Sequence, residues 1–408
     1  MVSRTIVPAL ALLAGLAIPL SAQAQGTSKF TFAPSFGTYG VYDDNLFSTS
    51  TEEQVGSYYL RFTPAFTTGY GGTSFSFNAG YGFDAELYPD ERTELTDPFA
   101  RQRATIGLGY AMTRTASLSF NASYTTSNRP SDLVEDTGLE LGRRNSQSYG
   151  AGLSFNKQLS TQDSWNVGYN ARLLEYEGGS NSSISHGVTT GWSHRYSTLS
   201  TTQLSYSYRR YSFGDELTGV VLDGRTSQSH LVTFGWTRQL GERTSMTLQV
   251  GPRLSDDFVN INTSEDLELK IGSAVGADAI ASINYNRDKT NLSLAYARHE
   301  SQVFARSGFV DTDSVVFSFG QGAGRSFHFS VSPGVYRNTR GSAETWTYRA
   351  SVNASQGITE WLHLTASYRY SLQQGRFVNT LGGTVVDGRE FDRNVVTFGL
   401  TLGHTFAQ

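Results

Sequence analysis

The feature that most constrains this chain is the alternation of apolar and polar side chains along one segment after another. In 361–370 every even position is apolar and the odd positions are mostly polar, and 74–81, 117–124 and 203–209 repeat the pattern. Alternation with a period of two indicates a β-strand with one apolar face. Because many such segments follow in series without an all-apolar core strand, the pattern favours a closed sheet with an apolar outside and a wet inside.

The composition agrees with a wall that is one residue thick. Only 38% of the 408 residues are hydrophobic, which is less than a globular domain of this size normally needs. The absence of cysteine excludes disulfides, thiolate metal sites and a cysteine nucleophile. A net charge of -4 argues against a broad nucleic-acid surface, so we expect no nucleic-acid partner.

The first 24 residues predict a secretory signal peptide. Arg4 gives the positive start, 6–20 the apolar run, and Ala22-Gln23-Ala24 the small-x-small cleavage pattern. A retained membrane anchor is the alternative, but the run is short for a membrane span. We therefore expect a cleaved signal over 1–24, Sec-type secretion, and one domain over 25–408. After residue 24 no apolar run reaches the ~18 residues of a transmembrane helix, so a membrane span must use strands.

The connections between the alternating segments are of two kinds. One set is short, as at 70–72 and 287–290, and the other is longer and acidic, as at 43–54 and 128–142. Short turns on one rim and long loops on the other are typical of outer-membrane barrels. We therefore predict an all-β fold, a transmembrane antiparallel up-and-down β-barrel in the cell outer membrane and its lipid, with about eighteen strands and sixteen as the alternative. The expected strands are 29–42, 55–69, 73–87, 100–112, 116–127, 144–157, 164–177, 184–196, 201–213, 227–239, 244–255, 272–286, 291–303, 313–320, 325–337, 344–355, 360–372 and 391–406.

A barrel of this size leaves an aqueous channel, so the residues on its luminal face are candidate functional residues. Basic residues are strongly skewed, with 28 arginines against 4 lysines. The arginines whose position in the alternation faces the lumen are Arg61, Arg101, Arg103, Arg172, Arg195, Arg209, Arg253, Arg349 and Arg369. They either select an anionic solute or are paired with acids from the long loops and brace the wall. Asp84 is the clearest luminal acid.

Catalysis finds little support in the sequence. There is no GxSxG sequence and no nucleotide-binding loop, and among the seven histidines only His186 and His194 could form a pair on one strand face. No Ser/His or paired-carboxylate constellation is visible. We therefore expect no enzyme activity, no cofactor and no metal site.

The segment Val41-Tyr42-Asp43-Asp44-Asn45-Leu46-Phe47 resembles the opening of β-barrel porins encoded with exopolysaccharide biosynthesis genes, the EpsL-like outer-membrane proteins. The whole mature chain shares the barrel architecture of this family, whereas the sequence motif is shared only in this segment, at Tyr42, Asp43, Asp44 and Asn45. It implies export of a secreted polysaccharide, an anionic one if the arginines contact it, together with periplasmic polysaccharide-export components.

The same four residues also have local interpretations. Asp and Asn form turns at strand ends because they hydrogen-bond their own backbone. Their oxygens could also hold a divalent cation together with Glu52 and Glu53. Turn formation is the favoured interpretation.

The chain ends in an alternating apolar segment. Phe398, Leu400, Leu402 and Phe406 keep the alternation, while His404 departs from it. On family resemblance, such a closing strand is the signal that the barrel-assembly machinery reads.

Three functions follow from these features and stay open. The first is polysaccharide export, for which luminal Tyr39, Tyr59 and Tyr336 could stack on sugar faces. The second is a general or anion-preferring diffusion porin. The third is a structural or adhesive barrel with a plugged lumen.

Overall fold

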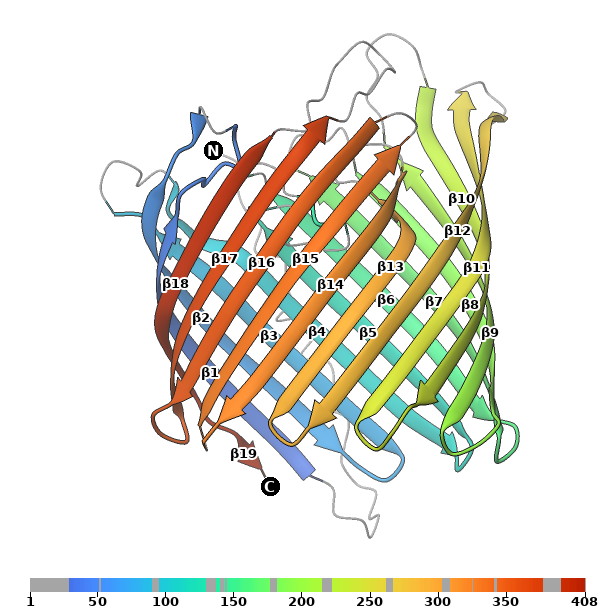
Figure 1. Cartoon of the computed structure of the whole chain (residues 1–408), viewed down its shortest axis with the longest axis horizontal. Coiled ribbons are helices and arrows are strands. Elements are labelled where there is room, and N and C mark those ends of the chain that lie inside the picture. The colour runs from blue at the N-terminus through green and yellow to red at the C-terminus, as the bar shows by residue number, and fades with distance from the viewer. Residues whose placement is uncertain are drawn as a thin grey trace, which may run out of the picture.

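The protein folds into a closed antiparallel barrel of eighteen long strands, with a two-residue strand β19 at its end (Figure 1). The computed structural model describes residues 29–50, 53–89, 95–129, 137–139, 143, 145–176, 182–214, 222–261, 267–302, 309–324, 326–340, 343–376 and 390–407. Each strand is hydrogen-bonded to its neighbours in sequence, and β1 pairs with β18 to close the ring. The predicted signal peptide and Glu52 lie outside the described residues.

The strands alternate in direction around the wall. Their bounds are β1 Lys29–Asp43, β2 Ser57–Gly71, β3 Phe75–Leu87, β4 Asp97–Thr113, β5 Ala116–Ser127, β6 Ser146–Gln158, β7 Asp163–Tyr176, β8 Ser183–Arg195, β9 Ser200–Phe213, β10 Leu222–Gln239, β11 Thr244–Ile261, β12 Leu267–Arg287, β13 Thr290–Gln302, β14 Phe309–Ala323, β15 Phe327–Arg340, β16 Ala343–Gly357, β17 Leu362–Arg376, β18 Phe391–Gly403 and β19 Phe406–Ala407. This confirms the predicted fold and the count of eighteen strands. Turns of two to four residues join the strands at one rim, whereas the connection from β5 to β6 at the other rim covers 128–145.

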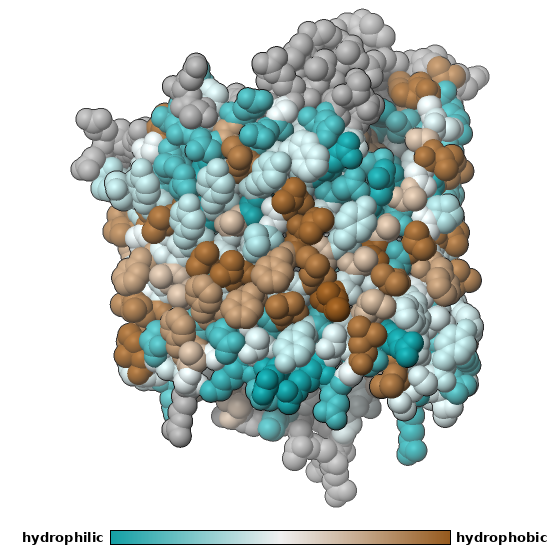
Figure 2. All heavy atoms as spheres, viewed as in Figure 1, coloured by the Kyte–Doolittle hydropathy of each residue, from teal (hydrophilic) through white to brown (hydrophobic). Residues whose placement is uncertain are grey.

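The two faces of the wall differ as the alternation predicts. Exposed apolar side chains such as Leu204, Phe234, Leu248 and Phe398 lie on the outside. On the face shown in Figure 2, apolar residues gather across the middle of the barrel. A sheet without free edges and with an apolar outer band satisfies its backbone hydrogen bonds in lipid. No helix in the described residues is long and apolar enough to cross a membrane.

The strands β10, β11 and β12 are longer than predicted. β11 and β12 extend into the acidic segment 256–271, which we expected to be a loop, and β10 begins at Leu222 instead of residue 227. Asp256 forms an ion pair with Lys270 at 2.8 Å, and Asp257 forms one with Arg225. The acids are thus cross-strand partners rather than loop residues, and β11 continues to Ile261.

The closing strand is interrupted at His404, whereas the sequence predicts one strand over 391–406. β18 ends at Gly403, opposite Ser35 of β1, and pairing resumes in β19, where Phe406 lies opposite Phe32. Pro34 occupies the gap on β1. A proline has no N–H to donate to a sheet, so the ladder loses a hydrogen bond there.

Candidate functional site

The described residues of the connection between β5 and β6, which are 128–129, 137–139, 143 and 145, include several that contact the luminal face instead of staying at the rim. At its start, the Arg129 guanidinium donates to the Tyr59 hydroxyl of β2 at 2.9 Å. The same group lies 3.5 Å from the Asp43 carboxylate of β1 and 3.9 Å from that of Glu86 of β3. Both carboxylates are almost fully buried. The connection is therefore anchored to three strands by one arginine.

Arg143 fastens the other described end of the connection to the same place. It lies 3.1 Å from the Glu86 carboxylate and donates to the Tyr88 hydroxyl at 2.7 Å. The ring of Tyr88 stacks on that of Tyr59, with centroids 4.8 Å apart. Burial, and next the charge of Glu86, raise the pKa of Tyr88, so its hydroxyl stays neutral and donates to Glu86.

Asp43 also joins the first and last long strands. Arg393 of β18 contacts both oxygens of the Asp43 carboxylate, at 2.9 and 2.6 Å. Such a bidentate pair fixes geometry as well as charge. We call Asp43, Glu86, Arg129, Arg143 and Arg393 the anchor cluster.

The other residues of the predicted motif also act across the β1–β18 seam. The Asp44 carboxylate accepts from the backbone and side-chain N–H groups of Asn394, and the Asn45 amide donates to the Asp392 carbonyl at 2.9 Å. Asn45 also accepts from the Thr49 backbone N–H, which is the predicted turn chemistry. Turn formation is therefore only part of their role, because most of the contacts are non-local. The described residues contain no group of side chains arranged to hold a metal ion.

Residues 137–139 of the same connection contact β15 and β16, on the opposite side of the barrel from β5 and β6. Asn338 donates to the Thr137 carbonyl at 2.8 Å, and Arg349 donates to the Leu139 carbonyl at 3.5 Å. Between them Gly138 has a φ of 64°, and a Cβ there would come 2.5 Å from the Tyr336 ring. The described residues of the connection therefore contact both sides of the lumen, and position 138 requires glycine.

A second element enters the lumen at the ends of β13 and β14. Pairing between β12 and β13 stops at Ala279 and Arg298, although both strands continue. Beyond that point the ring of Phe309, at the start of β14, touches the Tyr211 ring of β9 at 4.6 Å and lies near that of Phe213. Both β9 residues face the lumen by register, so the β13–β14 end is folded against the inner wall.

Arg253 of β11 holds this folded end. The arginine is 5% exposed and forms ion pairs with Asp278 of β12 and Asp311 of β14, and it lies 3.7 Å from Glu300 of β13. Nearer the short-turn rim, the side chains on the same face of β13 and β14 as Glu300 and Asp311 point outward. Glu300 and Asp311 nevertheless lie close to the luminal Arg253. The end of the hairpin has therefore left the wall.

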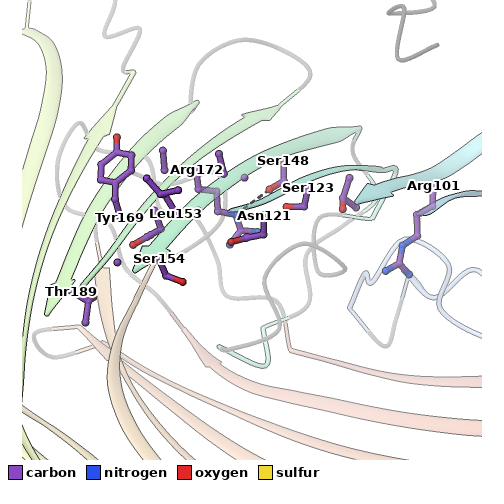
Figure 3. Close-up of a pocket in the computed structure, with 16 residues that line it drawn as sticks. Arg101, Asn121, Ser123, Ser148, Leu153, Ser154, Tyr169, Arg172 and Thr189 are labelled. Atoms are coloured by element: carbon purple, nitrogen blue, oxygen red, sulfur yellow. Dashed lines mark hydrogen bonds between the residues drawn. The ribbon is translucent and has the colours of Figure 1, made fainter. Parts of the chain in front are cut away.

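A hollow of about 510 Å³ lies against the luminal faces of β4 to β8. Arg101 and Arg172 line it, together with small polar residues such as Asn121, Ser123 and Ser148 (Figure 3). The Arg172 guanidinium donates to the Ser148 hydroxyl at 3.0 Å. Among the described residues, no carboxylate lines this hollow.

The register places all nine predicted arginines on the luminal face, but it does not bring them together. Arg103 pairs with Asp84 at 3.0 Å, and Arg195 lies at the short-turn end of β8. The others are spread around the wall. Each of these seven lies on a different strand, in the order β2, β4, β7, β9, β11, β16 and β17: Arg61, Arg101, Arg172, Arg209, Arg253, Arg349 and Arg369. Their part in selecting solutes stays a prediction.

The expectation that loop acids would neutralise wall arginines is reversed in the anchor cluster. There the strands supply Asp43 and Glu86, and the connection supplies Arg129 and Arg143. Sequence reasoning missed these two arginines because it assigned 128–142 to an external loop, which contains Arg129 and ends one residue before Arg143. It also missed Arg393, whose luminal position in β18 was available from the alternation.

Two predicted sugar-stacking residues are covered by the connection. Tyr59 is 2% exposed beneath Arg129, and the Tyr336 ring lies beneath Gly138. The Tyr39 hydroxyl contacts Thr401 across the β1–β18 seam at 2.7 Å. Tyr59 is therefore not available to stack on a sugar, whereas Tyr336 is only partly covered and its stacking role stays a prediction.

A closed eighteen-stranded barrel with an apolar outer band and a polar, partly crossed lumen defines a transmembrane β-barrel of the outer-membrane type. No protein-family model matches the sequence, and no curated protein sequence matches it. The comparisons therefore give no support to the resemblance to exopolysaccharide-associated porins, which stays a prediction.

The solved structures to which the chain is similar at low identity include the following three. For OccAB4 of Acinetobacter baumannii the identity is 9%, the TM-score 0.49, and the coverage 94% of this chain and 99% of that one. For OpdK of Pseudomonas aeruginosa with vanillate the values are 10%, 0.47, 93% and 99%. For the FrpB iron transporter of Neisseria meningitidis they are 10%, 0.47, 87% and 64%, so this chain spans less than two thirds of FrpB.

Proposed function

We propose that this protein is an outer-membrane channel through which small anionic solutes diffuse. The observation that carries the proposal is the cationic lining of the hollow beside β4 to β8, to which Arg101 and Arg172 contribute guanidinium groups. Asp84 of β3 lies opposite Arg101 in the register and forms an ion pair with Arg103 at 3.0 Å, so arginines outnumber acids on this part of the luminal face. Guanidinium groups keep their charge at physiological pH and bind carboxylates and phosphates. Arginines lining a pore favour anions. The two inward elements restrict the passage, which favours small solutes over large ones.

The test is the reversal potential of single channels in planar bilayers under a KCl gradient. We expect the wild-type channel to prefer chloride and the Arg101→Gln/Arg172→Gln variant to lose much of that preference. Arg238→Gln is the matched control, because Arg238 lies on the outward face of β10 above the Trp236 ring. It removes one positive charge of the same kind from outside the lumen, so its reversal potential should equal that of the wild type.

Three results would contradict the proposal. One is an unchanged reversal potential in the double variant, and another is an equal shift in the Arg238 control. The third is a wild-type barrel without conductance, which would mean that the crossing connection closes the lumen. Export of a polysaccharide stays a separate prediction of the family resemblance, tested by deleting the gene and measuring the amount and location of secreted polymer.

A further inference from the structure

A row of alternating asparagine and glycine residues runs around the inner wall from β3 to β8 and ends on an arginine of β9. Each residue lies directly opposite the next in the strand register. In order around the wall, the row consists of Asn78, Gly107, Asn121, Gly152, Asn170, Gly187 and Arg209. We call these residues the Asn–Gly row, and its middle part lies in the hollow beside β4 to β8.

The three asparagines of the row share one orientation. The Asn121 side-chain oxygen lies over the backbone of Gly152 on the next strand, where a Cβ would come within 2.5 Å of it. Asn78 lies in the same way over Gly107, and Asn170 over Gly187. The glycines are therefore what allows the amides to lie flat along the wall, all leaning toward the following strand.

The amides of the row have no hydrogen-bond partner among the described residues. Within the described part of the chain, no hydrogen bond joins the side chain of Asn78, Asn121 or Asn170 to another residue, and all three side chains are exposed to the lumen. Each amide offers two donors and an acceptor. A hydroxyl group can serve as the partner of either, so a solute rich in hydroxyls matches these groups best.

The row also climbs the wall, and its last member changes chemistry. Asn78 lies three residues after the start of β3 (78 − 75), Asn121 five after that of β5 (121 − 116) and Asn170 seven after that of β7 (170 − 163). Arg209 continues this series on β9, where it lies nine residues after the start of the strand (209 − 200). Successive members lie two strands apart, about 10 Å. Amide sites therefore lead from the short-turn rim to a guanidinium.

We propose that the Asn–Gly row binds hydroxylated carboxylates of the sugar-acid class as they pass. The amides of Asn121 and Asn170 receive the hydroxyl groups, and Arg209, one strand beyond Gly187, receives the carboxylate. This inference rests on the proposed function and deepens it, because it adds a preference for hydroxyl groups to the preference for anions. It follows from asparagine side chains that have no hydrogen-bond partner among the described residues and from the glycines that hold them in one orientation.

The test compares how two six-carbon carboxylates block the KCl current through the whole channel. We expect gluconate to block at a lower concentration than hexanoate, which has the same charge and no hydroxyls. In Asn121→Ala/Asn170→Ala the half-blocking concentration of gluconate should rise by about tenfold, since each lost hydrogen bond costs about a factor of three to five. The value for hexanoate should stay unchanged.

Two further variants separate binding from folding. Gly152→Ala keeps every amide but places a Cβ against Asn121, so it should weaken the gluconate block as well. Asn291→Ala is the matched control, because Asn291 lies over Gly320 in the same way but stands outside the row. Its gluconate block should equal that of the wild type.

The inference is overturned if gluconate and hexanoate block the wild type equally, if the double variant keeps the difference, or if Asn291→Ala removes it. Failure of this inference is distinguishable from failure of the proposed function, because the proposed function is tested by the KCl reversal potential and not by block of the current. A wild-type channel without anion preference that still discriminates gluconate from hexanoate would refute the proposed function and support the row.

Discussion

The Arg129 guanidinium lies 3.5 Å from the Asp43 carboxylate, and this pair ties the connection that crosses the lumen to the seam where the barrel closes. Asp43 is fully buried and serves Arg129 and Arg393 together. Removing one partner of such a pair leaves the others with uncompensated charge. The closure of the barrel and the narrowing of its lumen therefore depend on the same carboxylate.

We expect Asp43→Ala to release the β5–β6 connection and destabilise the barrel. Loss of a buried ion-pair partner typically costs about 3–5 kcal/mol. Single-channel conductance should rise, and the midpoint of urea unfolding in detergent should fall. Glu242→Ala, at an exposed turn of the opposite rim, is the control and should change neither. A variant with wild-type conductance would show that the pair does not hold the crossing.

Substitution at Gly138 should move the tip of the same connection without touching any charge. Gly138→Ala places a methyl group against the Tyr336 ring and puts an L-residue at positive φ, which costs about 1–2 kcal/mol before the collision is counted. We expect a higher conductance. Gly241→Ala adds a methyl group in open space and should behave like the wild type, so equal effects of the two changes would refute the assignment.

The inward position of the β13–β14 end can be trapped by a thiol-specific cross-linker, because the chain has no native cysteine. Tyr211→Cys/Phe309→Cys replaces two aromatic side chains whose ring centroids lie 4.6 Å apart, so a bifunctional maleimide can fill the space between the two thiols. We expect this reagent to cross-link them, as measured by the shift of protease-cut fragments on a gel. Adding Arg253→Met leaves three carboxylates without their shared cation and should abolish the cross-link, whereas Arg238→Met should not.

The closing strand offers a prediction about assembly. Phe398, Leu400, Leu402 and Phe406 are exposed on the outer face of the last two strands. If they form the signal read by the assembly machinery, Phe406→Asp should lower the amount of heat-modifiable, folded barrel in outer-membrane fractions. Thr405→Asp is the control for charge at the same place, and an equal loss in both variants would argue against a specific role for the aromatic residue.

Most of the architecture could be predicted because a membrane wall imposes a local rule. Each strand must alternate between lipid and water, so its length, its direction and the face of residues such as Arg172 or Leu204 can be read from neighbouring positions. The deviations occurred where that rule stops. At Pro34 a missing N–H interrupted the closing strand, and at Asp256 cross-strand partners extended strands into a predicted loop.

The sequence by itself determined the barrel, its strand count and the set of side chains that face the lumen, because these depend on contacts between neighbours in the alternation. Only the tertiary structure decided which of these side chains meet. That Arg129 reaches Asp43, that Arg253 gathers acids from three other strands, and that Asn78, Asn121 and Asn170 form one climbing row depend on register and on chain segments far apart in sequence. The alternation fixes the face of each residue but carries no information about its height relative to residues on other strands.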